Sequence, residues 1–242
     1  MYIIYSKEKT VQDYTYIKNN LYKVRSLAES AAIRAGVKMP KLIAVTKSAS
    51  DEEVMALAGF GIEAIGENRT TLFNSRYDLL KDKFPQIEFH LIGHLQTNKV
   101  KYIANRATLI HSLDSLRLAS EIEKQGAKHG IKIPMLIEVN SGREEAKSGV
   151  FPEDVLSFHE SLSGFEHLSI CGLMTMAPDF ENKEDYRPYF RGTYKTFEAI
   201  RAQGGFDTDA PTLSMGMSDS FEVAIEEGAT AIRVGRRLFL NS

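Results

Sequence analysis

The sequence predicts an α/β protein, a single (β/α)8 TIM barrel formed by residues 1–242 with an additional helix before the first strand. Three observations predict this class. The length of 242 residues is close to the roughly 250 residues of an ordinary barrel of this kind. Short apolar runs rich in β-forming residues recur eight times, with helical patterns between them. No Gly-x-Gly-x-x-Gly turn follows the first strand, which disfavours a doubly wound sheet.

The additional helix comes first along the chain. Apolar residues recur every three or four positions over Tyr14–Ala35, and Gly36 ends the pattern. The first strand is expected at Leu42–Thr46, a short apolar run. It is followed by Lys47 and then by Ser50–Glu53, a capping-box sequence that opens the next helix. This stretch therefore predicts a strand, a turn and a helix.

The same order of signals returns along the rest of the chain. Further strands are expected at Ile62–Ile65, Ile87–Ile92, Thr108–His111, Pro134–Val139, Leu168–Met174, Thr212–Met215 and Thr230–Val234. Clear helical patterns between them cover Ser115–His129, Pro152–Leu162 and Tyr186–Ala202, each closed by glycine. Strands alternating with helices imply parallel strands joined by right-handed crossovers.

Composition excludes several classes of partner. The chain has 30 basic and 32 acidic residues, a net charge of −2 and no block of like charge, so we expect neither nucleic acid nor a membrane surface as a partner. A small molecule is expected instead. The single cysteine, Cys171, cannot form an intramolecular disulfide, and residues 1–20 lack a basic head followed by an apolar run. These features favour a cytoplasmic protein, which we expect to act as a monomer.

In such a barrel the functional site lies where the strands end at their carboxyl side. The residues that end or follow the predicted strands are Lys47, Glu67, Asn68, His90 to His94, Ser112, Asp114, Asn140, Met174, Thr175, Ser214–Asp219 and Gly235–Arg237. Lys47 can be an ordinary solvated lysine at a strand end. Alternatively, it projects into a closed barrel mouth, where burial and nearby cations favour the neutral amine that forms Schiff bases.

The seventh and eighth loops carry a candidate phosphate site. Ser214–Asp219 joins a strand to a helix expected from about Asp219 to Glu227, with Ser218 as its N-cap and Gly216 permitting a tight turn. Gly235–Arg237 adds backbone donors and two cations. Taken alone, the seventh loop is explained as the start of an ordinary capped helix and the eighth as a pair of surface arginines. Phosphates commonly bind at these two loops of a barrel, and the presence of donors in both favours a phosphate site.

No metal site is expected. His90 and His94 lie four residues apart, but they flank a strand end with Gly93 between them, and no third ligand is evident. Cys171 lies inside a predicted strand and is expected to be a small core residue, because no activating partner is apparent.

The segments found above, in this order, resemble one known family. They are Ala44-Val-Thr-Lys47, Gly66-Glu-Asn68, His90-Leu-Ile-Gly-His-Leu-Gln-Thr-Asn-Lys99, His111-Ser-Leu-Asp-Ser115, Glu138-Val-Asn140, Glu144-Glu-Ala-Lys-Ser-Gly149, Gly172-Leu-Met174, Ser214-Met-Gly-Met-Ser-Asp219 and Val234-Gly235. Together they resemble the pyridoxal phosphate homeostasis proteins of the YggS/PROSC type, which are related to the barrel domain of alanine racemase. The resemblance spans nearly the whole chain, and the third and eighth stretches are its most specific parts.

The resemblance implies a cofactor, pyridoxal 5′-phosphate (PLP), held as a Schiff base on Lys47. It implies that Arg233 faces the pyridine nitrogen, that Asn68 and His90 line the ring, and that the phosphate is surrounded by Ser214, Met217, Ser218, Gly235 and Arg236. The sequence departs from the family after Asn68, where relatives usually carry Val-Gln-Glu, and after Phe239, where a glycine normally follows.

Two functions are compatible with this site. The first, implied by the resemblance, is a PLP homeostasis protein that binds PLP and delivers it to PLP-dependent apoenzymes, with no robust turnover and no catalytic residue. The alternative is a PLP-dependent amino-acid racemase; a weaker third is an aldolase-type lyase using Lys47. Racemisation requires acid–base groups on both faces of the substrate carbon. Lys47 serves one face, and the tyrosine that serves the other in alanine racemases belongs to an additional domain that we do not expect here.

Overall fold

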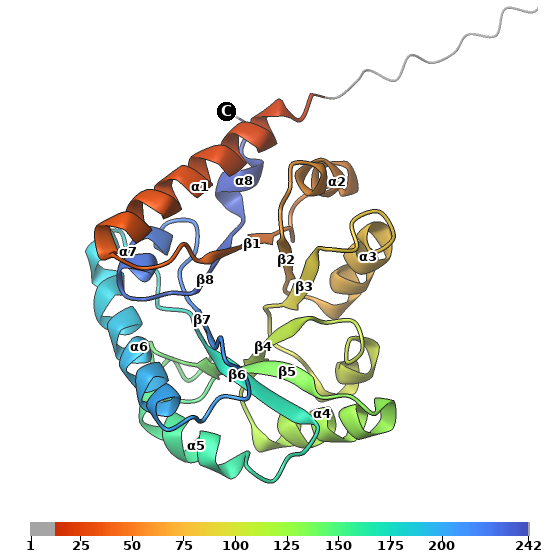
Figure 1. The fold of residues 1–242 in the computed structure, drawn as a ribbon, viewed down its shortest axis with the longest axis vertical. Coiled ribbons are helices and arrows are strands. Elements are labelled where there is room, and N and C mark those ends of the chain that lie inside the picture. The colour runs from red at the N-terminus through yellow and green to blue at the C-terminus, as the bar shows by residue number, and fades with distance from the viewer. Residues whose placement is uncertain (1–12, 242) are drawn as a thin grey trace, which may run out of the picture.

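The computed structural model describes residues 13–241 and shows eight parallel strands that close into a barrel in chain order (Figure 1). Residues 1–12 and 242 of the predicted domain lie outside this description. The strands are β1 Lys41–Val45, β2 Ala64–Glu67, β3 Glu88–Leu91, β4 Leu109–Leu113, β5 Ile133–Val139, β6 Leu168–Thr175, β7 Thr212–Ser214 and β8 Ala231–Val234. The predicted TIM barrel is therefore confirmed, with strand boundaries within about two residues of those expected.

Helices surround the strands as the outer layer of the barrel (Figure 1). They are α1 Thr15–Ala35, α2 Asp51–Gly59, α3 Thr70–Leu80, α4 Leu116–His129, α5 Val155–Ser161, α6 Arg187–Ala202, α7 Phe221–Glu226 and α8 Arg236–Phe239, with 3₁₀ segments η1 Thr97–Tyr102, η2 Pro152–Asp154 and η3 Lys183–Tyr186. Between β3 and β4 the crossover contains η1 in place of an α-helix. Within residues 13–241, no helix combines the length and apolar character needed to cross a bilayer.

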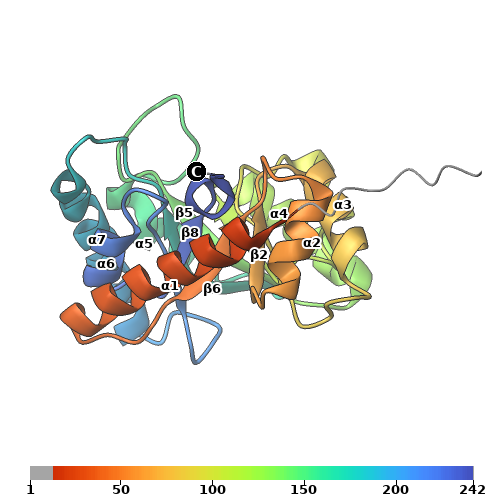
Figure 2. The same cartoon turned by 90° about the horizontal axis from the view of Figure 1, so that it is seen from above.

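The predicted additional helix, α1, lies across α7 and α8 on the outside of the barrel (Figures 1 and 2). Its inward face is apolar and no more than 3% exposed, comprising Ile17, Leu21, Val24, Ala28, Ala31 and Ala32. The Asn20 side-chain amide donates to the Leu240 carbonyl at 2.8 Å. Gly36 ends the helix in the left-handed conformation, with φ of 67°, which a residue without Cβ adopts at no steric cost. The chain beyond β8 is thus held by α1.

The capping box predicted at the start of α2 is present. The Ser50 hydroxyl accepts a hydrogen bond from the Glu53 backbone N–H at 3.2 Å, and the Glu53 carboxylate accepts one from the Ser50 N–H at 2.7 Å. Because two backbone donors at the helix start are satisfied, the loop from β1 into α2, which carries Lys47, has a fixed end.

Candidate functional site

A cavity of about 540 Å³ lies at the carboxyl ends of the strands, and we call it the rim cavity. It is lined by Val45, Lys47, Ser48, Asn68, Ile92, Gly93, Met176, Asp179, Tyr186, Met217, Ser218, Asp219, Ser220, Arg233, Gly235 and Arg236. Seven of the predicted cofactor-binding residues are among them, namely Lys47, Asn68, Met217, Ser218, Arg233, Gly235 and Arg236. They come from β8 and from the loops after β1, β2, β7 and β8, which the barrel brings to one end.

Lys47 lies two residues after Val45, the last residue of β1, and is exposed at the cavity. The side chain is therefore not buried, as the second of the two interpretations given for this lysine would require. Its charged neighbour is Glu67, the last residue of β2, which is 1% exposed. Burial raises the pKa of Glu67 to about 7, against the lowering effects of a hydrogen bond from Thr46 and of the Lys47 charge.

Arg76 of α3 ties this carboxylate to the loop that carries Lys47. The guanidinium is 3% exposed, and its Nε lies 3.8 Å from the Glu67 carboxylate. Its terminal nitrogens donate to the Ala49 carbonyl and to the Asp51 carboxylate. One buried arginine thus connects the end of β2 with the loop from β1 into α2.

Arg233 of β8 forms a buried cationic part of the cavity lining. The residue is 3% exposed, its Nη1 donates to the Ser214 hydroxyl at 2.6 Å, and its Nη2 donates to the Thr175 carbonyl at 2.9 Å. Burial lowers the pKa of Arg233 to about 10, so the side chain is still a cation at neutral pH. Ser214 does not line the rim cavity itself; it lies buried behind Arg233, as the acceptor of its hydrogen bond.

The loop after β7 differs in one respect from the expectation. Helix α7 begins at Phe221 with Ser220 as N-cap, so the predicted cap at Ser218 and the helix start at Asp219 are wrong. The reason is a turn in which the Phe221 N–H donates to the Met217 carbonyl at 2.9 Å. Ser218, 5% exposed, lines the cavity without serving as a cap.

Glycines allow the loops after β7 and β8 to pack closely. Gly216 has φ of 90°, and a Cβ there would lie 2.5 Å from the Ala224 Cβ. A Cβ on Gly235 would lie 3.0 Å from the Val45 carbonyl oxygen. Next to Gly235, Arg236 is exposed and forms an ion pair with Asp219 across the two loops. An exposed cation therefore lies where the loops after β7 and β8 meet at the rim.

His90 is not part of the rim cavity. It belongs to β3 and lines a second cavity, of about 760 Å³, together with Lys41 and Glu88. These lie at the start of β1 and β3, so this cavity opens at the amino-terminal mouth of the barrel. Successive side chains of a strand point to opposite sides. The residues next to β3 that line the rim cavity are Ile92 and Gly93, which follow the end of the strand. Proximity to the strand end in sequence did not determine which end of the barrel His90 faces.

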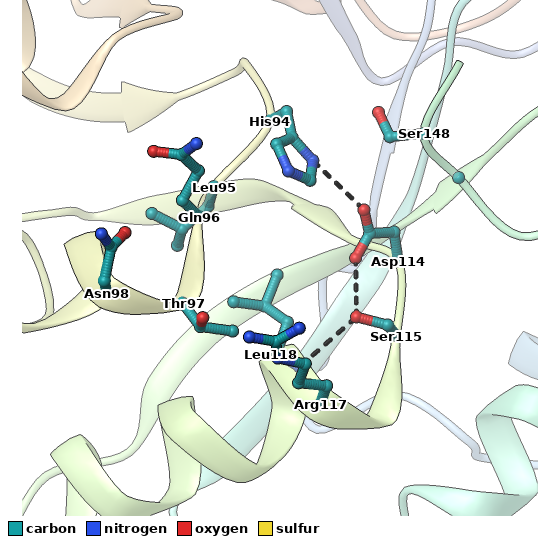
Figure 3. A pocket seen from close by; sticks show the side chains of 11 residues that line it. His94, Leu95, Gln96, Thr97, Asn98, Asp114, Ser115, Arg117, Leu118 and Ser148 are labelled. Atoms are coloured by element: carbon teal, nitrogen blue, oxygen red, sulfur yellow. Dashed lines mark hydrogen bonds and ion pairs between the residues drawn. The ribbon is translucent and has the colours of Figure 1, made fainter. Parts of the chain in front are cut away.

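His94, the other histidine of the pair, lines a neighbouring cavity of about 640 Å³, shown in Figure 3. Its Nδ1 lies 3.3 Å from the Asp114 carboxylate, to which the Ser115 hydroxyl also donates at 2.9 Å (Figure 3). The two histidines therefore face different cavities. Among residues 13–241 no group of three or more His, Cys, Asp and Glu side chains is placed to hold a metal ion.

Several cavity residues had no role in the sequence prediction. Met176 directly follows β6 and could have been found by the strand-end argument, whereas Asp179 and Tyr186 lie farther along the connection after β6, where that argument does not apply. Arg76 lies on a helix face, and nothing in local sequence indicates that it reaches Glu67. Gly93 is required because a Cβ there would lie 2.4 Å from the Asn68 carbonyl oxygen, a contact that only the fold creates.

Comparison with known proteins gives a consistent result. The family model described as alanine racemase, N-terminal domain, matches residues 12–242. A pyridoxal phosphate homeostasis protein from Aquifex aeolicus is 42% identical over 221 residues, covering 90% of this chain and 95% of that protein. One from Helicobacter pylori is 38% identical over 201 residues, covering 82% of this chain and 86% of its own length.

Solved structures agree with these relatives. An unknown protein from Bifidobacterium adolescentis superposes with a TM-score of 0.89 at 31% identity, covering 96% of this chain and 98% of its own. PipY from Synechococcus elongatus, solved with PLP bound, has a TM-score of 0.79 at 28% identity, with 93% and 100% covered. Alanine racemase from Clostridium difficile, at 15% identity and a TM-score of 0.75, shares the fold over 57% of its length. This chain belongs to the alanine racemase N-terminal domain family and, within it, to the pyridoxal phosphate homeostasis proteins.

Proposed function

We propose that this protein binds PLP in the rim cavity as a Schiff base on Lys47 and serves PLP homeostasis in the cytoplasm. The observation that carries the proposal is the convergence of a lysine, a buried arginine and two donor-rich loops on one cavity of about 540 Å³. That volume is typical of a small-molecule site. Bound PLP supplies an aldehyde that condenses with an amine and a phosphate dianion that anchors the molecule.

The residues present fit the separate parts of this cofactor. Lys47 offers the amine, and Arg233, held by Ser214 and Thr175, offers a fixed cationic donor to the pyridine nitrogen. For the phosphate, Ser218 contributes a hydroxyl, Gly235 and Arg236 contribute backbone N–H groups, and Arg236 also contributes a charge. Met217 lines the same part of the cavity, with its own N–H donated to the Ser220 hydroxyl at 3.1 Å. Asn68, which lines the same cavity, would contact the ring. His90, which faces the other mouth, is left out of this set.

We propose carriage of PLP without robust turnover, with PLP-dependent apoenzymes as the recipients and a monomer as the working form. A racemase needs a second acid–base group opposite Lys47. Tyr186 is the one tyrosine lining the described rim cavity, and its hydroxyl is engaged by the Phe180 backbone, as donor at 3.3 Å and acceptor at 3.1 Å. This engagement supports the carrier over the racemase.

The test is the visible spectrum of the PLP-loaded protein and its Lys47→Ala variant. We expect the variant to lose the absorbance of lysine-bound PLP and to keep its circular dichroism. Lys147→Ala is the matched control, since Lys147 is an exposed lysine paired with Glu144 on another loop, and it should keep the absorbance. Loss of colour in the control and not in Lys47→Ala would refute the assignment.

Two further measurements separate the functions. Pyridoxal without phosphate should bind more weakly than PLP, and Ser218→Ala should reduce that difference modestly, because several donors share the anion. Turnover is measured as solvent deuterium incorporation into alanine and serine. A rate above about 1 s⁻¹, within the ordinary enzyme range, would replace the carrier by the racemase.

A further inference from the structure

A chain of hydrogen bonds crosses the inside of the barrel from one mouth to the other, and we call it the axial chain. It consists of Arg233, Ser214, His111, His90, Glu88 and Lys41, which come from β8, β7, β4, β3 and β1. At the rim end, Arg233 donates to the Ser214 hydroxyl at 2.6 Å, and His111 Nδ1 lies 3.1 Å from the same oxygen. These three residues are at most 3% exposed.

The chain continues to the amino-terminal mouth. His111 Nε2 lies 2.9 Å from His90 Nδ1, and His90 Nε2 lies 3.0 Å from the Glu88 carboxylate. Lys41 donates to both oxygens of Glu88 at 2.6 Å. The side chains of Lys41 and Glu88 are 39% and 33% exposed, so only this end of the chain meets solvent.

The charges at the ends determine where each proton lies. Hydrogen bonds from His90 and from Lys41 lower the pKa of Glu88 to about 2, so this carboxylate only accepts. His90 therefore carries a hydrogen on Nε2. Burial lowers the pKa of His90, which keeps the ring neutral and leaves Nδ1 as an acceptor.

The same reasoning fixes the inner half of the chain. His111 must donate from Nε2 to His90, and burial together with the nearby Arg233 cation holds its pKa well below the usual value. The neutral His111 ring then accepts on Nδ1 from the Ser214 hydroxyl. Ser214 in turn accepts from Arg233. From Arg233 to Glu88 every donor points away from the rim, and Glu88 accepts from His90 on one side and from Lys41 on the other.

We infer that Glu88, His90 and His111 are positioning residues that orient Arg233 towards the ring nitrogen of PLP, an inference that rests on the proposed function. With Nη1 held by Ser214 and Nη2 held by the Thr175 carbonyl, two fixed points set the plane of the guanidinium. Reversal of any one hydrogen bond would place two donors or two acceptors against each other inside the barrel. The carboxylate at the far mouth thus controls a group in the rim cavity.

The first test needs neither a variant nor the cofactor. The ¹⁵N NMR spectrum of histidine-labelled protein at neutral pH should show His90 and His111 as neutral rings protonated on Nε2. A cationic ring, or a proton on Nδ1 of either residue, would overturn the oriented chain. This result does not depend on whether PLP binds.

The second test uses Glu88→Gln, with Glu63→Gln as the matched control, since Glu63 is an exposed carboxylate just before β2 at the same mouth. Each protein is titrated with PLP and with the analogue whose ring nitrogen is replaced by carbon. We expect Glu88→Gln to bind PLP about tenfold more weakly, and the carbon analogue as the wild type does. The control should bind both as the wild type does.

The outcomes separate the two proposals. Equal weakening for both ligands would assign the chain a purely structural role and refute the inference, as would unchanged binding of PLP. Failure of the wild type to bind PLP at all would refute the proposed function. If Glu88→Gln does not fold, Lys41→Gln removes the cation that holds Glu88 and is expected to weaken PLP binding in the same selective way.

Discussion

The pH dependence of stability should reveal the buried carboxyl of Glu67. Its pKa is raised to about 7 from an ordinary value of 4.5, chiefly by burial. Between these two pH values the folded protein holds a proton that the unfolded chain has lost. The free energy of unfolding therefore has its full contribution from Glu67 below pH 4.5 and loses it as the pH rises towards 7. The interval corresponds to roughly 3 kcal/mol.

Replacement of Glu67 by glutamine removes this titration while preserving the side-chain shape and an acceptor for the Thr46 hydroxyl. We expect the variant to gain about 3 kcal/mol relative to the wild type between pH 4.5 and pH 8. For a chain of this length the gain corresponds to roughly 6–12 °C in Tm. The assay is urea unfolding followed by circular dichroism at a series of pH values.

The comparison between Glu67→Gln and the wild type isolates one group from all the others that titrate in this range. Glu63→Gln, at an exposed position just before the same strand, is the matched control. Arg76, with its Nε 3.8 Å from the Glu67 carboxylate, opposes the effect of burial. The reasoning fails if the difference in free energy of unfolding between Glu67→Gln and the wild type does not change with pH. Glu67 would then be ionised throughout, because the charge of Arg76 outweighs the effect of burial.

Two glycine positions give further predictions. Gly172→Ala should lower the free energy of unfolding by at least about 3 kcal/mol, because φ is 144° and the new Cβ would lie 1.9 Å from the Thr212 carbonyl oxygen of the neighbouring strand. An unchanged midpoint in urea unfolding would refute this contact. Gly93→Ala should weaken PLP binding about tenfold in a titration with the fold retained, because the Cβ displaces the Asn68 backbone, and wild-type affinity would contradict this. Gly192→Ala, in α6 with open space around it, is the control for both and should stabilise by up to about 1 kcal/mol.

Local sequence was sufficient for the elements and for much of the rim. Alternating strand and helix signals predicted the barrel, and the Ser50–Glu53 capping box was confirmed because it depends on hydrogen bonds between residues three positions apart. Lys47, Asn68 and Gly235 follow strands, and parallel strands in one barrel bring their carboxyl ends to one face. Residues selected in this way meet in the rim cavity because chain direction alone decides which end of the barrel they occupy.

The tertiary structure alone decided what lies inside the barrel and behind the rim. His90 is one residue from the end of β3 but faces the opposite mouth, and it meets His111 of β4 only through the register of these neighbouring strands. The pairing of Arg76 with Glu67 likewise joins a helix to a strand end. Barrel closure and stagger set these contacts between distant residues, whereas periodicity in the sequence records only which side of an element is apolar. The sequence by itself thus determined the barrel and the loops that form its rim. The closed barrel determined which buried charges and hydrogen bonds lie inside the barrel, beneath those loops.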